Sequence, residues 1–398
     1  MSFFDASAPL VVNIVSAPRF CAFDLARELE SLGYLGRLYT AFPKSKVRPH
    51  YQGQRVSTFP WLLGPYWVAG CIHWTGLHSE LGWWLTDSFD RWAGRAMTPC
   101  TVIHALSSWS LYSGRAAKEK YDALVVYDRG SGQLRFEEEL MSEEATLHGV
   151  ARRNIDERYL IKDDIECALA DIIIVPSAYA LRTFVGRGVS AVKIHIVPLT
   201  ANLALFKPSV KHDRMFRVIF AGRAGLTKGI LYLLRAVEYL PRTSLECVIF
   251  GEIEPEMAFL LKKYRRIPNI RWRGAVPQTV LAEEMTQGSV LVLPSLSEGF
   301  GMVVAQAMAC GLPVIVSENT GAADIVEDGK SGFIVPIRDV DAIRTKLLFL
   351  YENPAMCTDM GNCALHSLQA LGSWNVYAKK LVEVYQSGLG ELHRGRLV

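Results

Sequence analysis

Short apolar runs alternate with amphipathic stretches along the whole chain. In the first half these runs cover residues 10–15, 101–105, 123–127, 171–176 and 192–198. They lack polar alternation, which is typical of parallel strands covered on both faces. A stretch with helical spacing follows the first run at residues 23–32 and ends at Gly33. Strands that alternate with helices predict βαβ units and a doubly wound sheet.

The second half repeats this pattern. Strands are predicted at 216–221, 245–250, 290–294, 314–316 and 333–336, and helices at 230–240, at 302–310 and from 339 onward. A polar, proline-containing segment at 199–215 separates the halves and reads as a linker. We therefore expect an α/β protein with two Rossmann-like domains, at 1–205 and 206–373, and a C-terminal helix within 374–398. Residues 42–95 show no clear helix or strand pattern.

Composition narrows the class of protein. The 398 residues include 43 Lys and Arg against 40 Asp and Glu, so a nucleic-acid partner is not indicated. The 8 cysteines are scattered without a C-x-x-C pair, which favours neither a zinc site nor a disulfide framework and suits a reducing, cytoplasmic compartment. No apolar segment reaches the ~18 residues that a membrane span needs, and residues 1–9 do not resemble a signal peptide. A soluble or peripheral protein is expected.

Tryptophan is unevenly distributed. Six of the nine Trp lie between residues 61 and 92, after the basic residues Lys44, Lys46, Arg48 and Arg55. Aromatic residues beside basic ones suit a membrane interface or a hydrophobic acceptor. The alternative is packing between helices of the first domain, which the high average burial of Trp favours slightly.

Two loops carry candidate chemistry. In the first, at 221–229, a strand leads through Gly222, Gly225 and Gly229 into a helix. Arg223 and Lys228 would lie at the carboxyl end of that strand, where open α/β sheets bind ligands, and both can bind phosphate oxygens. The alternative is a solvated loop with two surface cations.

The second loop, Ser297-Glu298-Gly299-Phe300-Gly301-Met302, also joins a strand to a helix. Its backbone N–H groups would lie at the helix N-terminus, which favours an anion. It is not the dinucleotide fingerprint, because the third glycine would fall at Val304. Glu298 either caps the helix or accepts hydrogen bonds from ligand hydroxyls. An anion site beside a hydroxyl acceptor suits a sugar nucleotide.

The stretch PSLSEGFGMVVAQAMACGLPVIVSENTGAADIVEDGKSGFIV resembles the signature of family 4 of the retaining GT-B glycosyltransferases, also called group 1. FAGRAGLTKG resembles that family's donor-phosphate loop, and the resemblance is looser over residues 1–200. It implies two Rossmann-like domains that face a cleft, with the C-terminal helix crossing back to the first. It also implies metal-independent, retaining transfer from a UDP- or GDP-sugar to a glycan or lipid-linked acceptor, without a further cofactor. Cell-surface polysaccharide or glycolipid synthesis is the implied setting.

The resemblance also implies roles for single residues. Arg223 and Lys228 match the pair that binds the donor diphosphate, and Glu298 matches the glutamate that binds the donor sugar. The remaining predicted donor contacts are Gly222, Gly299, Phe300, Gly301, Met302, Gln306 and Thr320. Gln306 stands where the family has the glutamate that holds the ribose; an amide oxygen can still accept from a hydroxyl, without charge assistance.

A second departure lies in the first domain, where many members of the family carry a histidine. Here Asp128 and Arg129 occupy the end of a predicted strand, facing the expected cleft. Asp128 could orient the acceptor or accept its proton, and Arg129 could contact a phosphate; alternatively the two pair with each other. His104 reads more readily as a core or strand-end residue than as an acceptor contact, and Arg19 is a weaker acceptor candidate.

Two further patterns favour structural roles. The acidic residues between 137 and 144 are expected to form a solvated helix face. Asp339 and Asp341 form a D-x-D pattern, but their place at the start of a helix predicts capping rather than metal binding.

Other functions remain open from the sequence. One is a non-catalytic partner subunit that binds a nucleotide sugar or glycan, which Gln306 and the missing histidine would suit. Another is a sugar-nucleotide epimerase or a phosphorylase on the same fold. The E-G-F-G loop after the basic pair favours transfer.

Overall fold

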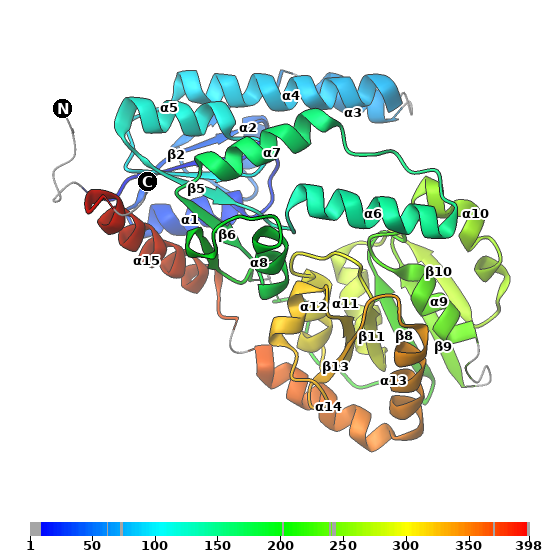
Figure 1. Cartoon of the computed structure of the whole chain (residues 1–398). Helices are drawn as coiled ribbons and strands as arrows, with labels where there is room; N and C mark the ends of the chain where they lie inside the picture. The colour runs from blue at the N-terminus through cyan, green and yellow to red at the C-terminus, as the bar shows by residue number, and fades with distance from the viewer. Residues whose placement is uncertain are drawn as a thin grey trace.

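Two parallel β-sheets, each packed between helices, form the protein (Figure 1). The computed structural model describes residues 9–61, 63–71, 75–200, 203–238, 240, 244–368 and 371–395. Most strand residues are buried in both sheets, as the apolar runs predict, whereas three strands at the edges of the sheets are largely not. None of the helices in this part of the chain combines the length and the apolar character needed to cross a bilayer.

The first sheet has seven strands in the order β3-β2-β1-β4-β5-β6-β7. Its strands are β1 (Val12–Val15), β2 (Leu35–Thr40), β3 (Val56–Thr58), β4 (Val102–Leu106), β5 (Leu124–Asp128), β6 (Ile172–Val175) and β7 (Ile194–Ile196). The helices between them are α1 (Ala22–Ser31), α2 (Lys44–Val47), α3 (Leu63–Cys71), α4 (Thr75–Ala96), α5 (Leu111–Tyr121), α6 (Leu134–His148), α7 (Glu157–Leu169), α8 (Ala178–Val185) and the 3-10 turn η1 (Ala191–Lys193).

The second sheet has six strands in the order β10-β9-β8-β11-β12-β13. Its strands are β8 (Phe216–Ala221), β9 (Leu245–Phe250), β10 (Ile270–Gly274), β11 (Val290–Leu293), β12 (Val314–Ser317) and β13 (Gly332–Val335). Its helices are α9 (Ile230–Glu238), η2 (Pro255–Met257), α10 (Ala258–Leu261), η3 (Tyr264–Arg266), α11 (Gln278–Thr286), α12 (Met302–Ala309), η4 (Gly321–Ile325), α13 (Val340–Glu352) and α14 (Pro354–Ser367).

The last helix, α15 (Trp374–His393), follows the second sheet in sequence but packs on the first (Figure 1). It contacts α1 and β5. Gly388 lies so close to Leu124 and Ile172 that a Cβ there would be 2.5 Å from the Ile172 side chain. The predicted crossing of the C-terminal helix is therefore confirmed, together with the two Rossmann-like sheets.

Strand order reverses at one point in each sheet. Chain order runs outward in both directions from the pair β1 and β4 in the first sheet, and from β8 and β11 in the second. At such a switch point the loops that leave the two strands diverge and open a crevice at their carboxyl ends. The two candidate loops of the second half leave β8 and β11, so they flank the crevice of that sheet.

The region at 42–95 contradicts its sequence interpretation. It holds α2, β3, α3 and the 22-residue α4, where no helix or strand was predicted. Strands β2 and β10 were missed as well, since polar residues such as Arg37, Arg271 and Arg273 interrupt their apolar pattern.

The acidic helix α6 also differs from expectation. Its Glu138 and Glu144 are buried rather than solvated. Glu144 accepts a hydrogen bond from the Tyr232 hydroxyl of α9 at 2.6 Å, and Arg338 of the second half pairs with it at 2.8 Å. Figure 1 shows α6 lying beside the second sheet. Glu144 therefore joins the two halves, whereas Glu138 pairs with Arg152 of the first half.

Candidate functional site

The loop after β8 carries the two predicted phosphate-binding cations. Gly229 closes the loop with a φ of +62°, and a Cβ at this position would lie 2.0 Å from the carbonyl oxygen of Pro294, so only glycine fits. The Arg223 side chain is 79% exposed, with its Nε 3.8 Å from Glu254 Oε1. Lys228 is more enclosed, with a side chain 26% exposed.

Lys228 donates a hydrogen bond to the carboxylate of Glu298, which the second loop supplies. The pKa of Lys228 is lowered to about 8, mainly by burial and next by the neighbouring charge of Arg223. Glu137 and Glu254 act in the opposite direction. The two sequence motifs therefore meet at one ion pair, where the lysine is charged at neutral pH.

The loop after β11 brings Glu298 to Met302 to the N-terminus of α12. Gly301 takes the N-cap position with a φ of +89°. The backbone N–H of Gly321 donates to the carbonyl oxygen of Glu298 at 2.8 Å, which ties the loop to the chain after β12. The side chain of Phe300 is buried, so Phe300 can reach a ligand through its backbone alone.

A cavity of about 590 Å³ opens beside these loops. Four of the predicted donor residues line it, namely Gly222, Arg223, Met302 and Gln306. Gln278, which the sequence interpretation missed, lies on the same wall and accepts a hydrogen bond from Gln306 Nε2 at 3.0 Å. The amide oxygen of Gln306 takes no part in this hydrogen bond. No sequence motif marks Gln278, because the loop after β10 follows a strand that was itself missed.

The side chain of Thr320 is not available as the predicted donor contact. Its side chain is fully buried, and its hydroxyl bonds to Ser317 Oγ at 3.0 Å and to the carbonyl oxygen of Leu293 at 3.3 Å. The hydroxyl is therefore occupied within the domain and does not reach a ligand. Its methyl group instead packs near Gly301, so Thr320 shapes the loop.

The prediction that Asp128 faces the cleft is wrong. Asp128 is 3% exposed, and its Oδ2 lies 3.2 Å from Nε2 of His104. The other ring nitrogen of His104 lies 2.8 Å from the hydroxyl of Tyr385 on α15. This buried trio links the last helix to the ends of β4 and β5. Asp128 and His104 are therefore both bonded inside the first domain, and His104 is a core residue in the middle of β4.

Arg129 is buried too, and it does not pair with Asp128. Its guanidinium donates to the carbonyl oxygen of Gly132 at 2.9 Å and to Ser107 Oγ at 3.0 Å, and it lies 3.4 Å from Asp163 Oδ1. Asp163 lies on α7 and is fully buried. Arg129 is thus an internal cross-link of the loop after β5, which corrects both sequence alternatives for it. Among the acceptor-side candidates, Arg19 is the one whose side chain is exposed.

The loop after β11 in the second half contacts residues of the first half. Ser177 Oγ donates to the carbonyl oxygen of Gly299 at 2.7 Å, and Tyr179 donates through its hydroxyl to Ser297 Oγ at 2.8 Å. A Cβ on Gly299 would lie 2.0 Å from the carbonyl oxygen of Gly130. The glycine of the E-G-F-G loop is therefore required for close approach to the first domain, in addition to any role toward a ligand.

Asp339 caps α13, as predicted, by accepting a hydrogen bond from the backbone N–H of Ala342 at 2.8 Å. Asp341 pairs with Arg344 at 2.8 Å. Over the residues that the structure describes, no three His, Cys, Asp or Glu side chains are grouped as metal ligands.

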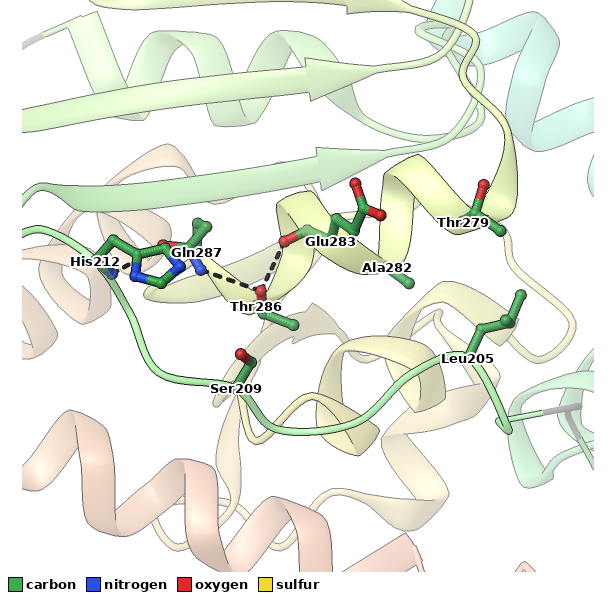
Figure 2. Close-up of a pocket in the computed structure, with 8 residues that line it drawn as sticks. All are labelled: Leu205, Ser209, His212, Thr279, Ala282, Glu283, Thr286 and Gln287. Carbon is green, nitrogen blue, oxygen red and sulfur yellow. Dashed lines mark hydrogen bonds between the residues drawn. The ribbon is translucent and has the colours of Figure 1, made fainter.

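A further hollow of about 540 Å³ lies between α11 and the linker that precedes β8 (Figure 2). Leu205, Ser209 and His212 line it from the linker. The backbone N–H of His212 donates to Gln287 Oε1 at 3.0 Å, which fastens the linker to the end of α11. None of the predicted donor residues lines this hollow, and we assign no chemistry to it.

Residues 203–366 match the protein family described as "Glycosyl transferases group 1". The match lies in the second half of the chain and includes both candidate loops. A D-inositol 3-phosphate glycosyltransferase of Pseudarthrobacter chlorophenolicus is 30% identical over 225 residues, which cover 52% of this chain and 53% of that protein. An MMP alpha-(1->4)-mannosyltransferase of Mycolicibacterium hassiacum is 25% identical over 228 residues, or 56% of each chain. The chain thus spans about half the length of the curated relatives it matches.

Solved structures resemble the whole fold. Sucrose-phosphate synthase from Thermosynechococcus elongatus has a TM-score of 0.68 at 20% identity, over 95% of this chain and 99% of that one. HepE from Anabaena, solved in complex with UDP and glucose, has a TM-score of 0.67 at 14% identity, over 95% and 100%. At such identities the likeness concerns the fold, which is GT-B. The resemblance inferred from the two group 1 glycosyltransferase motifs is confirmed.

Proposed function

We propose that this protein transfers a sugar from a nucleoside diphosphate sugar to a hydroxyl acceptor, with retention at the anomeric carbon and without a metal ion. One observation carries the proposal. The basic loop after β8 and the E-G-F-G loop after β11 flank the switch point of the second sheet and meet at the Lys228–Glu298 pair, beside a cavity of about 590 Å³. Ligands of open α/β sheets bind at such a point.

The charges at this site suit the departure of a diphosphate. Lys228 and Arg223 supply two cations, and the N-terminus of α12 adds its partial positive charge. Such preorganised charges stabilise negative charge that develops on a leaving group, which is usually the largest catalytic term. Glu298 would exchange its bond with Lys228 for hydroxyl groups of the donor sugar, which frees the lysine for phosphate oxygens.

The residues on the cavity wall would determine the specificity for the nucleotide. Gln306 and Gln278 form a neutral amide pair on its wall. The amide oxygen of Gln306 would accept hydrogen bonds from ribose hydroxyls. UDP- and GDP-sugars are the donors we expect, and the HepE structure in complex with UDP supports the first of them.

A thermal-shift screen tests donor binding first. We expect UDP or GDP to raise the melting temperature, since ligand at 100 times its Kd adds about 2.7 kcal/mol of stability. Incubation of the matching sugar nucleotide with glycan and lipid-linked acceptors should then yield product in the presence of EDTA, with the donor's anomeric configuration by NMR. An inverted product would contradict retention, and loss of activity in EDTA would contradict metal independence.

A non-catalytic role for the same site has Gln306 as its specific support. Such a partner subunit would bind the nucleotide without turnover. Donor binding that is positive while hydrolysis and transfer are absent across the acceptor panel would favour this alternative. An epimer formed from the sugar nucleotide alone would favour an epimerase.

We also propose that the first domain rests on the cytoplasmic face of a membrane, where it would reach a lipid-linked acceptor of polysaccharide or glycolipid synthesis. Trp61, Trp67 and Trp84 are 76%, 45% and 58% exposed. The ring centroid of Trp67 lies 6.3 Å from that of Phe42, which stands two residues before the basic helix α2. Aromatic rings beside Lys44 and Lys46 match an anionic interface. Trp74 lies outside the described residues.

Vesicle flotation tests this surface. We expect binding to vesicles that contain anionic lipid, and about tenfold weaker binding for Trp67→Ala with Trp84→Ala, since each exposed ring contributes apolar area. Phe259→Ala is the matched control, because Phe259 is 85% exposed but lies in the second half. Equal binding by the double variant and the control would contradict the membrane proposal while leaving the donor site untouched.

A further inference from the structure

Glu137, on the first turn of α6, lies between the two halves of the protein. Its Oε1 accepts hydrogen bonds from Ser297 Oγ at 2.8 Å and from the backbone N–H of Gly132 at 2.9 Å. Arg129 lies 3.5 Å from its other oxygen. Ser297 directly precedes Glu298 in the donor loop. The carboxylate of Glu137 thus connects the loop after β5 in the first half to the donor loop in the second.

The hydrogen bonds around Ser297 form a directed chain. The Tyr179 hydroxyl donates to Ser297 Oγ, and Ser297 Oγ in turn donates to Glu137. A serine hydroxyl has one proton to give, so its rotamer is fixed when it accepts on one side and donates on the other. Arg129 keeps Glu137 in place and is itself anchored by Asp163. The position of the donor loop therefore depends on a charged group of the other half.

Glu137 also acts on Lys228 electrostatically. The charged and titratable groups that face Lys228 are Glu298, which accepts its hydrogen bond, and Arg223, Glu254 and Glu137. Burial disfavours the ammonium form, and Glu137 and Glu254 favour it. Burial also raises the pKa of Glu137, while Arg129 and the hydrogen bonds from Ser297 and Gly132 favour its carboxylate form.

We propose that Glu137 is a positioning residue of the donor site: it holds Ser297, and with it the loop that carries Glu298, across the boundary between the halves. The proposal rests on the proposed function insofar as that loop binds the donor. Its consequence is that the donor site is complete only while α6 lies against the second half. Opening of the cleft would withdraw the carboxylate, loosen the Ser297–Gly299 loop and weaken the hold on the nucleotide at the same time.

Two variants separate the two roles. Glu137→Gln keeps an oxygen for Ser297 and Gly132 and removes the charge, whereas Glu137→Ala removes both. Glu139→Gln is the matched control, since Glu139 lies on the same helix, is exposed, and pairs with Arg187 of the first half. Circular dichroism and a urea transition first establish that each variant is folded.

Competitive labelling with trace acetic anhydride across pH 6–10, read by mass spectrometry, measures how much of Lys228 is neutral. At pH 7 we expect about threefold more acetylation of Lys228 in Glu137→Gln than in the unmodified protein, because one nearby negative charge is lost. Glu139→Gln should leave Lys228 unchanged. Unchanged labelling of Lys228 in Glu137→Gln would overturn the electrostatic role.

Hydrogen exchange of residues 295–301 measures the positioning role. We expect exchange about tenfold faster in Glu137→Ala than in Glu137→Gln, whose amide oxygen still accepts from Ser297. Equal exchange in the two variants would overturn this role. Neither measurement needs a donor or turnover, so a failure here is distinct from a failure of the proposed glycosyl transfer. If transfer is found, Glu137→Ala should show the largest loss of kcat/KM among these variants.

Discussion

The two sheets have the same strand layout at their crevice edges, but the charged residues there differ in how far they are buried. In the second sheet the loops after β8 and β11 leave Arg223 and Lys228 partly exposed beside a cavity. In the first sheet His104 lies in β4, Asp128 ends β5 and Arg129 follows it, and all three are 5% exposed or less. One edge leaves its cations accessible to a ligand, and the other uses its charged residues to hold the first half together.

The difference comes from what covers each edge. Helix α15 returns from the second half and brings the Tyr385 hydroxyl to His104. Helix α7 supplies Asp163 to Arg129. Within the described part of the chain no comparable helix closes over Arg223, whose side chain is 79% exposed. A charged residue at a strand end is therefore a ligand group or an internal cross-link according to its tertiary neighbours, and the neighbours of the first edge come from distant parts of the chain.

The largest expected effect concerns the donor edge. Lys228→Ala should lower kcat/KM by about 10²- to 10³-fold, the usual cost of removing one preorganised charge from a developing anion. Initial rates of transfer measure it, with Lys263→Ala as control, since Lys263 is an exposed lysine of the same half. Near-normal turnover of Lys228→Ala would mean that the second sheet does not use this charge in transfer, and would contradict the distinction between the two edges.

Backbone geometry of the donor loop gives the next effect. Gly229→Ala places a Cβ 2.0 Å from the carbonyl oxygen of Pro294, whereas Gly149 has a φ of +60° and nothing within 4 Å of its Cβ position. Both alanines pay about 1 kcal/mol or more for the left-handed conformation, and Gly229→Ala should cost about 2 kcal/mol more. Urea unfolding measures the free energy of unfolding of both variants. Equal losses would mean that the loop moves freely away from β11.

The acceptor edge should respond in stability rather than in chemistry. Asp128→Asn removes a buried charge partner of His104 and should cost about 2 kcal/mol of unfolding free energy, with kcat/KM within about threefold. Asp164→Asn is the control, because its 43% exposed side chain makes a surface pair whose loss costs about 0.5 kcal/mol. A hundredfold fall in kcat/KM at unchanged stability would return Asp128 to the reacting groups.

The smallest effect is a pH dependence of the donor edge. The pKa of Lys228 is lowered to about 8, so the ammonium form that binds phosphate is present below pH 8 and is lost as the pH rises through 8. Transfer should fall about tenfold between pH 7 and pH 9. In Lys228→Arg, whose guanidinium stays charged, the remaining activity should be level over this range. A fall of equal size in both proteins would assign the titration to another group.

Much of the fold followed from local pattern. Strands β8 and β9 lie within the predicted limits residue for residue, and Asp339 caps α13 as expected. Helix α4 was missed because its tryptophans and polar residues follow no simple apolar stripe, and part of its aromatic surface stays exposed. Trp92 packs against Phe59 and Phe89 while Trp84 of the same helix is open, so packing and surface roles divide the cluster.

The sequence by itself determined the doubly wound pattern and the place of the two candidate loops, because each depends on neighbours within a few residues. The need for glycine at Gly229 and Gly299 comes from tertiary contacts, with the carbonyl oxygens of Pro294 and Gly130. Tertiary structure alone decided that Asp128 and Arg129 are enclosed and that Glu137 reaches Ser297, 160 positions further along the chain. The burial and charge state of a carboxylate depend on every element packed around it. Here those elements are α6, α7 and α15, which the chain brings together only when both halves are folded.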